Sequence, residues 1–175
     1  MNPLAENANQ YQPPKITVLM PVYNVSKFLP KCLQTLMDQT FRDFRLIAVN
    51  DGSTDNCLEI LRDFESRYHN ITVIDQPNRG MSMARNAALA LADSKYVCFV
   101  DSDDYLAPTF LQELYQAITI HDADIACCYY YYHFVESDSL YKYPFRTSGV
   151  FNKEEALKKL LKDVQIQSLA WNKIY

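Results

Sequence analysis

Glycine is scarce in this sequence: among 175 residues there are only three, Gly52, Gly80 and Gly149. Dinucleotide-binding loops and P-loops need several glycines within a few positions, because their backbone must come close to phosphate groups. Three widely separated glycines cannot form either loop. The sequence therefore excludes GxGxxG dinucleotide-binding proteins and P-loop nucleotide triphosphatases.

Long hydrophobic runs are also absent. No window of about 18 apolar residues occurs, so the sequence predicts no membrane-spanning helix. The first residues, MNPLAENANQYQPP, have neither a basic start nor an apolar stretch. We expect residues 1–14 to be a flexible lead-in rather than a signal peptide or a membrane anchor.

The five cysteines form no CxxC pair and show no zinc-ligand spacing. Their number is odd, and Cys98 and Cys127 lie in apolar, strand-like runs, so we interpret them as small buried thiols in a reducing, cytoplasmic setting. The formal net charge of −4 argues against nucleic acid as a partner and against general attraction to anionic lipid. This net charge is compatible with a local basic site that binds a phosphorylated small molecule.

What the sequence does contain is a regular alternation of apolar runs and helical periodicity. Strands are predicted at 16–22, 44–51, 71–75 and 95–101, each followed by a helix. Pro30 is expected in the first turn of the first helix, Ser53 or Thr54 as N-cap of the second, and Pro108 at the start of the fourth. The alternation predicts one α/β domain over residues 15–175, with a mostly parallel sheet and helices on both faces.

The alternation stops after residue 122. Residues 123–135, ADIACCYYYYHFV, predict one long strand, and residues 139–151 predict a hairpin or a loop. For the tyrosines we favour a strand with Tyr129 and Tyr131 facing inward over a sugar-stacking platform.

The last predicted helix is charged and amphipathic. It spans residues 152–163, NKEEALKKLLKD, and is capped by Asn152. We interpret it as a solvated helix, and the leucines on one face leave a peripheral membrane contact as the alternative.

Polar motifs follow three of the predicted strands directly: residues 21–24 (PVYN), 50–55 (NDGSTD) and 101–104 (DSDD). Because the carboxyl ends of parallel strands meet at one edge of a sheet, the three motifs should converge on one crevice. Asp101 and Asp103 are two positions apart and can face one ligand on extended backbone. A divalent cation would hold both carboxylates and keep sites for phosphate oxygens. The alternative is a surface turn in which Ser102 or Asp104 caps the next helix.

The other two motifs carry similar ambiguity. Asp51 could accept a hydrogen bond from a nucleobase, or could belong to an ordinary turn. Gly80 frees the loop before the third helix, where Arg79 and Arg85 could meet a phosphate, although Arg85 could equally pair with the acids. Taken together, a nucleobase-type turn, a cationic helix start and metal-type acids describe a site for a nucleotide diphosphate.

These motifs resemble a known family. The segments ITVLMPVYNVSKFLPKCLQTLMDQTFRDFRLIAVNDGSTD, NRGMSMARNAAL and YVCFVDSDDYLAP, and LAWNKIY near the end, are similar to the inverting family-2 glycosyltransferases with a GT-A (nucleotide-diphospho-sugar transferase) fold. The resemblance implies a nucleotide-sugar-binding part at residues 15–122. It also implies an acceptor-side part at residues 123–175 that is incomplete, so that the fold is truncated at its C-terminal end.

The resemblance also implies roles for individual residues. The nucleoside pocket would be lined by Pro21, Val22, Tyr23 and Asn24, and Asp51 would contact the uracil N–H. The ribose and diphosphate would lie against Gly80 and Arg85. The substrate-binding DxD motif would be Asp101, Ser102 and Asp103, with Mn²⁺ or Mg²⁺ held by Asp103 and Asp101. Asn50 stands where the family often has a second aspartate, which puts an anionic role there in doubt.

The implied reaction is inverting transfer of a hexosyl group from a UDP-linked donor to a hydroxyl of a saccharide or lipid-linked saccharide acceptor, in polysaccharide biosynthesis. It would take place in the cytoplasm or at the inner face of the membrane. The family's general base lies beyond the WNK region, where this chain ends, so the base is unassigned. The alternatives are a nucleotide-sugar-binding module without transferase activity and a non-enzymatic α/β interaction domain.

Overall fold

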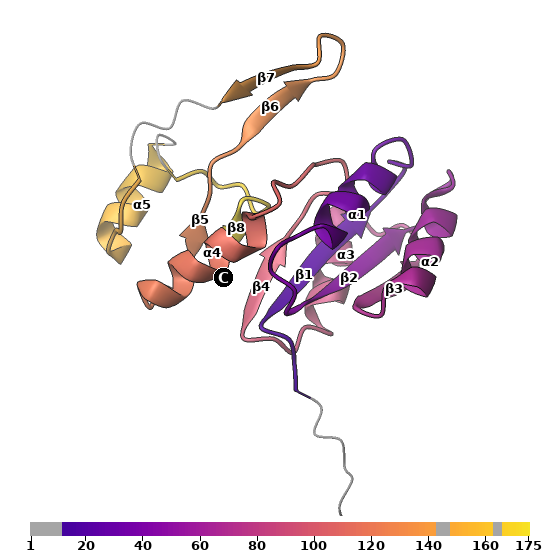
Figure 1. The fold of residues 1–175 in the computed structure, drawn as a ribbon, viewed down its shortest axis with the longest axis horizontal. Coiled ribbons are helices and arrows are strands. Elements are labelled where there is room, and N and C mark those ends of the chain that lie inside the picture. The colour runs from indigo at the N-terminus through magenta and orange to yellow at the C-terminus, as the bar shows by residue number, and fades with distance from the viewer. Residues whose placement is uncertain (1–11, 143–147, 163–165) are drawn as a thin grey trace, which may run out of the picture.

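The computed structural model describes residues 12–142, 148–162 and 166–175 (Figure 1). Most of the expected lead-in, residues 1–11, lies outside the described residues. The first eight elements alternate strand and helix as predicted: β1 (Ile16–Val22), α1 (Leu29–Met37), β2 (Phe44–Asp51), α2 (Cys57–Arg67), β3 (Ile71–Gln76), α3 (Met81–Leu89), β4 (Tyr96–Phe99) and α4 (Phe110–Ile120). The remaining elements are β5 (Ala126–Cys127), β6 (Tyr131–Phe134), β7 (Ser139–Lys142), α5 (Lys153–Leu161) and β8 (Lys173–Ile174).

The main sheet has six strands in the order β3-β2-β1-β4-β8-β5. The pairings among β1, β2, β3 and β4 are parallel, and β8 runs antiparallel to both β4 and β5. The prediction of a mostly parallel α/β sheet is therefore confirmed. The register aligns Val22 with Asn50 and Asn50 with Asp75, so the carboxyl ends of three strands lie level at one edge.

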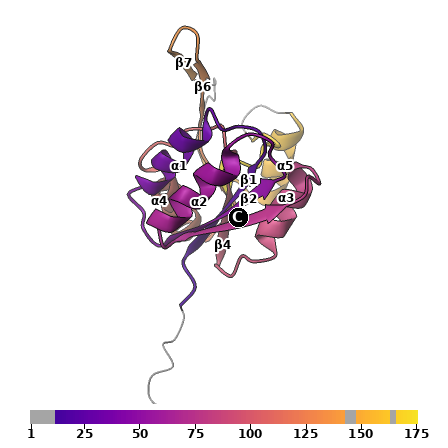
Figure 2. The same cartoon turned by 90° about the vertical axis from the view of Figure 1, so that its right-hand side faces the viewer.

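Helices cover both faces of this sheet, with α1, α2 and α4 on one side and α3 on the other (Figure 2). The larger apolar core lies under α1, α2 and α4 and includes Val18, Met20 and Leu33, all fully buried. The smaller core packs Leu19, Ile47 and Val49 against two alanines of α3, Ala84 and Ala88. Alanine side chains let α3 lie close to the sheet, which fixes the position of its N-terminus.

The helix starts agree only in part with the sequence predictions. Pro30 lies in the first turn of α1, as predicted. The N-cap of α2 is Asn56, so the prediction of Ser53 or Thr54 is wrong; both bond to the β1–α1 loop instead. The N-cap of α4 is Thr109, which means that Pro108 lies before the helix. Neither Ser102 nor Asp104 caps α4, so that alternative for the acidic motif is wrong.

The predicted long strand at 123–135 is divided into two strands. Its first part, β5, joins the main sheet, whereas β6 pairs with β7 in a hairpin that projects away from the sheet in both views (Figures 1 and 2). The inward tyrosine is Tyr130, which is 9% exposed, and Tyr129 and Tyr131 are exposed, so the predicted parity is wrong. The hydroxyl of Tyr130 donates to Gln167 at 2.7 Å, and its ring packs on Trp171. These two contacts turn Tyr130 inward.

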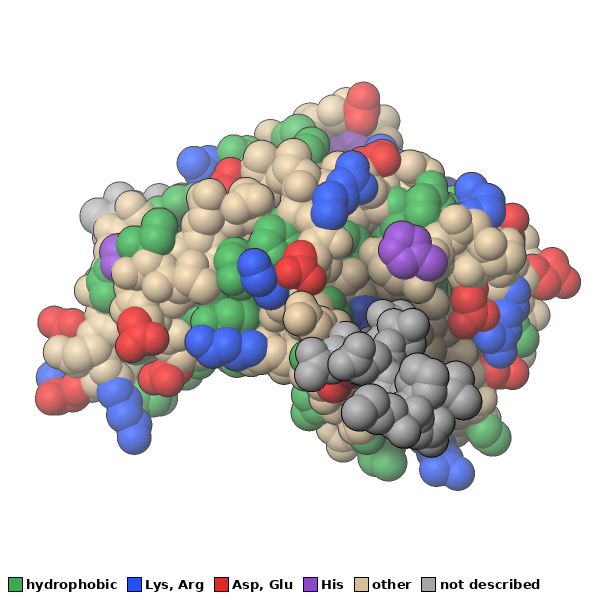
Figure 3. Space-filling view, turned by 60° about the horizontal axis from the view of Figure 1, so that its bottom comes forward, with side chains coloured by type: hydrophobic (Ala, Val, Ile, Leu, Met, Phe, Trp, Pro, Cys, Tyr) green, Lys and Arg blue, Asp and Glu red, His purple; other side chains and the backbone are tan. Residues whose placement is uncertain are grey.

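Helix α5 begins at a complete capping box, in which Asn152 accepts from the backbone of Glu155 and the Glu155 side chain accepts from the backbone of Asn152. This confirms Asn152 as the cap. Among the described residues, no helix is long and apolar enough to cross a membrane. Acidic and basic side chains are interspersed on the face shown in Figure 3.

The cysteines are unpaired, as expected, but they are not all buried. Cys32, Cys57 and Cys98 are buried, Cys128 is partly buried, and Cys127 is exposed. Cys127 belongs to the two-residue strand β5 at the edge of the sheet, where one side of the strand faces solvent. The expectation of buried thiols is therefore wrong for Cys127.

Candidate active site

Loop residues fasten the carboxyl ends of β1 and β2 together. The backbone N–H of Asn24 donates to the hydroxyl of Ser53 at 3.1 Å, and its side-chain oxygen accepts from the backbone of Thr54 at 2.7 Å. Asn24 has a φ of 53°, a left-handed conformation that asparagine tolerates better than most residues. The predicted nucleoside-pocket segment, Pro21 to Asn24, is thus fixed against the NDGSTD loop, with Tyr23 exposed beside it.

Asp51 is the anchor of the loop before α3. Its carboxylate accepts hydrogen bonds from the side chain of Gln76 at 2.7 Å and from the backbone of Arg79 at 3.0 Å and Gly80 at 2.8 Å. Burial opposes its ionisation, but these hydrogen bonds outweigh burial and lower the pKa of Asp51. Gly52 also lies against this loop, because a Cβ on it would come within 2.6 Å of the backbone nitrogen of Asn78. Asp51 therefore fixes where α3 begins.

Arg85 and Asp101 form an ion pair across the ends of α3 and β4. The guanidinium lies 2.7 Å from the carboxylate, and both side chains are about three-quarters buried. The possibility that Arg85 pairs with the acids is therefore confirmed. The Nε of Arg85 is buried and has no hydrogen-bond partner among the described residues. A buried donor of this kind favours an additional acceptor, such as a phosphate oxygen.

The remaining acids of the DSDD motif carry uncompensated charge. Asp103 is exposed and has no hydrogen bond or ion pair within the part of the chain that the structure describes. The pKa of Asp104 is raised to about 6. Burial is the largest cause, and the negative charges of Asp103 and Asp101 add to it. The described residues contain no group of three or more metal-ligating side chains. However, carboxylate oxygens are the donors that Mn²⁺ and Mg²⁺ prefer, and so the residues present fit a cation whose other ligands come from a diphosphate.

Asn50 lies at the end of β2, where the resemblance implied that the family often has a second aspartate. Its amide nitrogen donates to Asp75 at 2.7 Å, whereas its carbonyl oxygen is buried without a partner among the described residues. The bond to Asp75 fixes which end of the amide carries the unpaired acceptor. The sequence did not predict that this acceptor would be left unpaired.

Gln39 is a second residue that the sequence did not identify. Its side chain is completely buried and donates to the carbonyl of Ala107 at 2.7 Å, while its own carbonyl accepts from the backbone of Leu111 at 3.0 Å. It therefore satisfies a free N–H group in the first turn of α4 and fixes the loop that carries the DSDD motif. No local pattern in the sequence predicts such a long-range cap.

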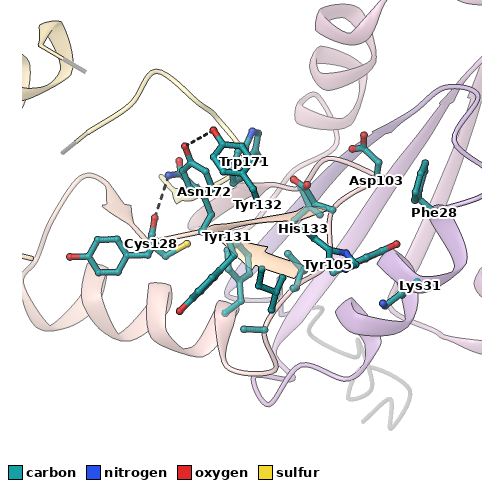
Figure 4. A pocket seen from close by; sticks show the side chains of 18 of the residues that line it. Phe28, Lys31, Asp103, Tyr105, Cys128, Tyr131, Tyr132, His133, Trp171 and Asn172 are labelled. Carbon is teal, nitrogen blue, oxygen red and sulfur yellow. Dashed lines mark hydrogen bonds between the residues drawn. The ribbon is translucent and has the colours of Figure 1, made fainter. Parts of the chain in front are cut away.

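A pocket of about 760 Å³ lies next to the acidic motif. One wall comes from the start of α1 and the β4–α4 loop, with Lys31, Asp103 and Tyr105, and the opposite wall comes from the β6–β7 hairpin and the segment before β8 (Figure 4). The side chain of Asn172 donates to the backbone of Cys128 at 3.3 Å and holds these two segments together. Asp103 is one of the residues that line this pocket. The DSDD motif therefore lies between the pocket and the Asp51 loop.

Comparison with known proteins decides the family. The family model described as glycosyl transferase family 2 matches residues 17–172, which is most of the chain. The chain belongs to glycosyl transferase family 2. It is also 37% identical over 169 residues to the glycosyltransferase GlyA of Streptococcus pneumoniae, covering 92% of this chain and 24% of that protein. The chain thus spans about a quarter of the length of this family-2 relative.

Solved structures of other proteins are also similar to this chain. The structure of S. aureus TarS residues 1–349 in complex with UDP-GlcNAc is 34% identical, with a TM-score of 0.60, over 63% of this chain and 33% of that one. The mannosyltransferase PcManGT from Pyrobaculum calidifontis, in complex with GDP-Man and Mn²⁺, is 22% identical, with a TM-score of 0.61, over 68% and 36%. The second likeness concerns the fold alone. The fold is of the GT-A type, as the resemblance implied.

Proposed function

We propose that this family-2 chain forms the donor-binding part of an enzyme that transfers a sugar, with inversion, from a UDP-linked donor to a hydroxyl acceptor in polysaccharide assembly. The observation that carries the proposal is the meeting of three loops at one sheet edge through Asn24, Asp51 and the Arg85–Asp101 ion pair. The complex of TarS with UDP-GlcNAc supports UDP as the nucleotide. The Mn²⁺ in the complex of the mannosyltransferase PcManGT supports a divalent cation.

In this proposal the nucleoside lies against Tyr23 and Asn24, because Pro21 and Val22, which were also predicted to line the pocket, are buried at the end of β1. Asp51 was expected to accept the uracil N–H, but its oxygens already accept three hydrogen bonds from the protein. The buried, unpaired carbonyl oxygen of Asn50 is a better acceptor for that N–H, since an unsatisfied buried acceptor gains most from a new partner. We therefore assign base recognition to Asn50 and loop positioning to Asp51.

The diphosphate lies, in this proposal, between the N-terminus of α3 and the acidic motif. Gly80 begins α3 with a φ of 86°, and the free backbone N–H groups of the first turn are donors for anions. The unpaired Nε of Arg85 supplies a further donor, and Asp103, with Asp101 beside it, would hold the cation. When bound, the cation supplies Lewis-acid stabilisation of the leaving diphosphate.

Thermal unfolding with UDP tests this proposal. UDP at about 100 times its Kd, with Mn²⁺ present, should stabilise the protein by about 2.7 kcal/mol. We expect Asp103→Asn to abolish that gain, because the cation loses its most accessible carboxylate. The matched control is Asp43→Asn, which alters an exposed carboxylate paired with Lys15 at 3.8 Å and should keep the gain.

The outcomes separate the alternatives. If neither UDP nor UDP with Mn²⁺ changes the unfolding temperature, the chain is an interaction domain and the proposal fails. If UDP binds in a metal-dependent way but no sugar is transferred to a saccharide acceptor, the chain is a nucleotide-sugar-binding module. Detection of an inverted glycosidic product supports the full proposal.

A further inference from the structure

Helix α5 leaves apolar side chains in solvent. It buries none of its residues, whereas each of the helices α1 to α4 buries at least two. Leu161 is 85% exposed, Leu157 is 48% exposed, and Val150, which lies two residues before the N-cap, is 64% exposed. The helix lies at the outer end of the molecule, beyond β5 (Figure 1). The described part of the chain therefore leaves an apolar surface on α5 largely uncovered.

Lysines border the exposed leucines. Side chains three or four positions apart lie side by side on a helix, so Lys153 lies next to Leu157, and Lys158 lies next to Leu161. Lys162 follows Leu161 directly at the end of the helix. The apolar surface of α5 is therefore surrounded by ammonium groups.

This segment is basic within an acidic chain. Residues 152–162 contain four lysines and two glutamates, a formal charge of +2, whereas the whole chain carries −4. Lys158 pairs with Glu154 at 2.7 Å, but both side chains are more than two-thirds exposed, and surface pairs of this kind are weak. Such a pair does not prevent the lysine from meeting another anion.

Two other strongly exposed apolar side chains lie near carboxylates instead. Ile120 is 73% exposed and is followed by Asp122 and Asp124, and Leu140 is 69% exposed and follows Asp138 by two residues. In contrast to these positions, α5 combines apolar exposure with positive charge. That combination is complementary to a membrane surface with anionic lipids.

We propose that α5 is a contact site for an anionic membrane surface, with Leu157 and Leu161 inserted among the lipid headgroups and the neighbouring lysines against lipid phosphates. The sequence left such a contact as the alternative to a solvated helix. A membrane fits better than a protein partner, because two leucines and a valine offer far less than the roughly 800 Å² that each partner buries in a stable protein interface. A lipid surface needs no complementary shape, and the apolar stems of lysines can extend along it while their charges reach the phosphates.

Vesicle flotation measures this contact directly. The full chain is incubated with vesicles of phosphatidylcholine alone, or of phosphatidylcholine and phosphatidylglycerol in equal parts, without nucleotide, sugar or divalent cation. We expect the chain to float with the anionic vesicles and to stay behind with the neutral ones. Binding should weaken as sodium chloride is added, because salt screens the attraction between lysines and lipid phosphates.

An apolar variant tests the role of the leucines. Leu161→Ser should weaken binding to the anionic vesicles about tenfold, because it removes the most exposed leucine of α5. The change removes little packing, since this side chain is already in solvent. Ile120→Ser is the matched control, because Ile120 is similarly exposed but lies near acidic residues. We expect it to bind as the unaltered protein does.

A charge variant tests the role of the lysines. Lys153 and Lys162 form no hydrogen bond or ion pair with any other described residue, so replacing both by glutamine removes charge without breaking a contact. We expect vesicle binding to fall at least about tenfold. The matched control replaces Lys15 and Lys95, two exposed lysines outside α5, by glutamine and should retain binding.

Three vesicle results would overturn the inference: no binding to the anionic vesicles, equal binding to both kinds of vesicle, or equal effects of the α5 variants and their controls. Sedimentation velocity without lipid tests the other candidate partner, a second copy of the chain. A dimer that Leu161→Ser dissociates would assign the leucines to self-association and would also overturn the inference. Since the vesicle assay contains no nucleotide or sugar, its failure leaves the proposed transferase function unaffected.

Discussion

At the scale of single residues, the candidate site contains two kinds of polar side chain. Some form hydrogen bonds with the protein, and a few have a buried polar atom without a partner among the described residues. Asp51 uses its charge to hold the loop before α3, whereas the carbonyl of Asn50 and the Nε of Arg85 are buried without partners among the described residues. Unpaired buried groups are costly, and proteins retain them mainly where a ligand completes them. If the proposed function is right, Asn50 would recognise the nucleobase and Asp51 would hold the loop in place.

Asp55 makes the stability of the site edge depend on pH. Its carboxylate accepts from the backbone of Ser26 at 2.9 Å and of Cys57 at 3.1 Å. Burial opposes ionisation, but hydrogen bonds from Cys57 and Ser26 outweigh it and lower the pKa of Asp55 to about 2, from a usual value of 3.8. Because the folded pKa is the lower one, its contribution is complete above about pH 4 and is lost as pH falls toward 2.

We therefore predict that Asp55→Asn is less stable than the unaltered protein by roughly 1 to 2 kcal/mol at pH 7. The difference should shrink as pH falls below about 4, because the Asp55 carboxyl of the unfolded chain then binds a proton, whereas that of the folded protein, with a pKa of about 2, is still ionised. Urea denaturation at pH 7, 5, 4 and 3 measures it. A difference that stays constant over this range would show that the charge of Asp55 has no part in stability.

At the scale of elements, the loop from β4 to α4 is held in place by α1 and the residues after it. Gln39 bonds to Ala107 and Leu111, the hydroxyl of Thr35 accepts from the backbone of Leu106 at 3.2 Å, and the backbone of Thr40 donates to Pro108 at 2.9 Å. This loop begins with the DSDD motif, so its position is determined by a helix far away in the sequence. The loop is consequently held in one position rather than free to adapt.

Removing the central contact tests this support. Gln39→Leu leaves the N–H of Leu111 unpaired in a buried position and removes one of the two hydrogen bonds that the carbonyl of Ala107 accepts, and we predict a loss of about 2 kcal/mol in unfolding free energy. The UDP-induced stabilisation should fall as well, because Asp103 is displaced with the loop. Gln34→Leu is the matched control, since Gln34 is exposed and bonds only to Asp38 among the described residues; its effect should lie within about 0.5 kcal/mol. Equal losses in the two variants would contradict the assigned role of Gln39.

At the scale of the whole molecule, the stabilising contacts are distributed unevenly. The two apolar clusters lie around the main sheet and α1 to α4, whereas α5 has no buried residue, and Leu161 is 85% exposed. Helix α5 is therefore supported mainly by its capping box and by surface pairs such as Lys158 with Glu154. Such a segment opens locally without global unfolding.

We predict that Asn152→Ala removes about 1 kcal/mol from α5 alone. Hydrogen exchange of residues 153–161 should become several-fold faster, while the global unfolding temperature stays the same. Asn56→Ala is the control, because Asn56 is the N-cap of α2 but makes no side-chain cap hydrogen bond there. A lower global unfolding temperature for Asn152→Ala would instead place α5 in the cooperative core.

The first eight elements could be predicted from the sequence because the spacing of their apolar residues is regular. The predictions were wrong for helix caps and side-chain orientations that depend on contacts between residues far apart in the sequence. Ser53 and Thr54 are good caps in isolation, but Asn24 takes their hydrogen bonds. Tyr130 points inward because it hydrogen-bonds to Gln167 and packs against Trp171. No residue near Tyr130 in the sequence indicates those contacts.

The sequence predicted which loops form the candidate site, but not the hydrogen bonds and packing contacts that connect their side chains. The three motifs at strand ends were visible in the sequence, since the carboxyl ends of parallel strands must meet. The support from Gln39 and the unpaired oxygen of Asn50 depend on side-chain packing across the sheet, which local patterns do not contain. The pocket wall made by the β6–β7 hairpin was hidden for the same reason.

The insertion of β8 between β4 and β5 has a consequence for the order of folding. Ala126 finds its partner in Ile174, so β5 has no neighbour in the main sheet until a much later segment has been synthesised and has docked. Contacts between residues far apart in sequence form slowly, because a long loop must close first. The sheet edge formed by β1 to β4 can therefore assemble early on the ribosome, whereas β5 joins the sheet only after the segment around Ile174 has docked.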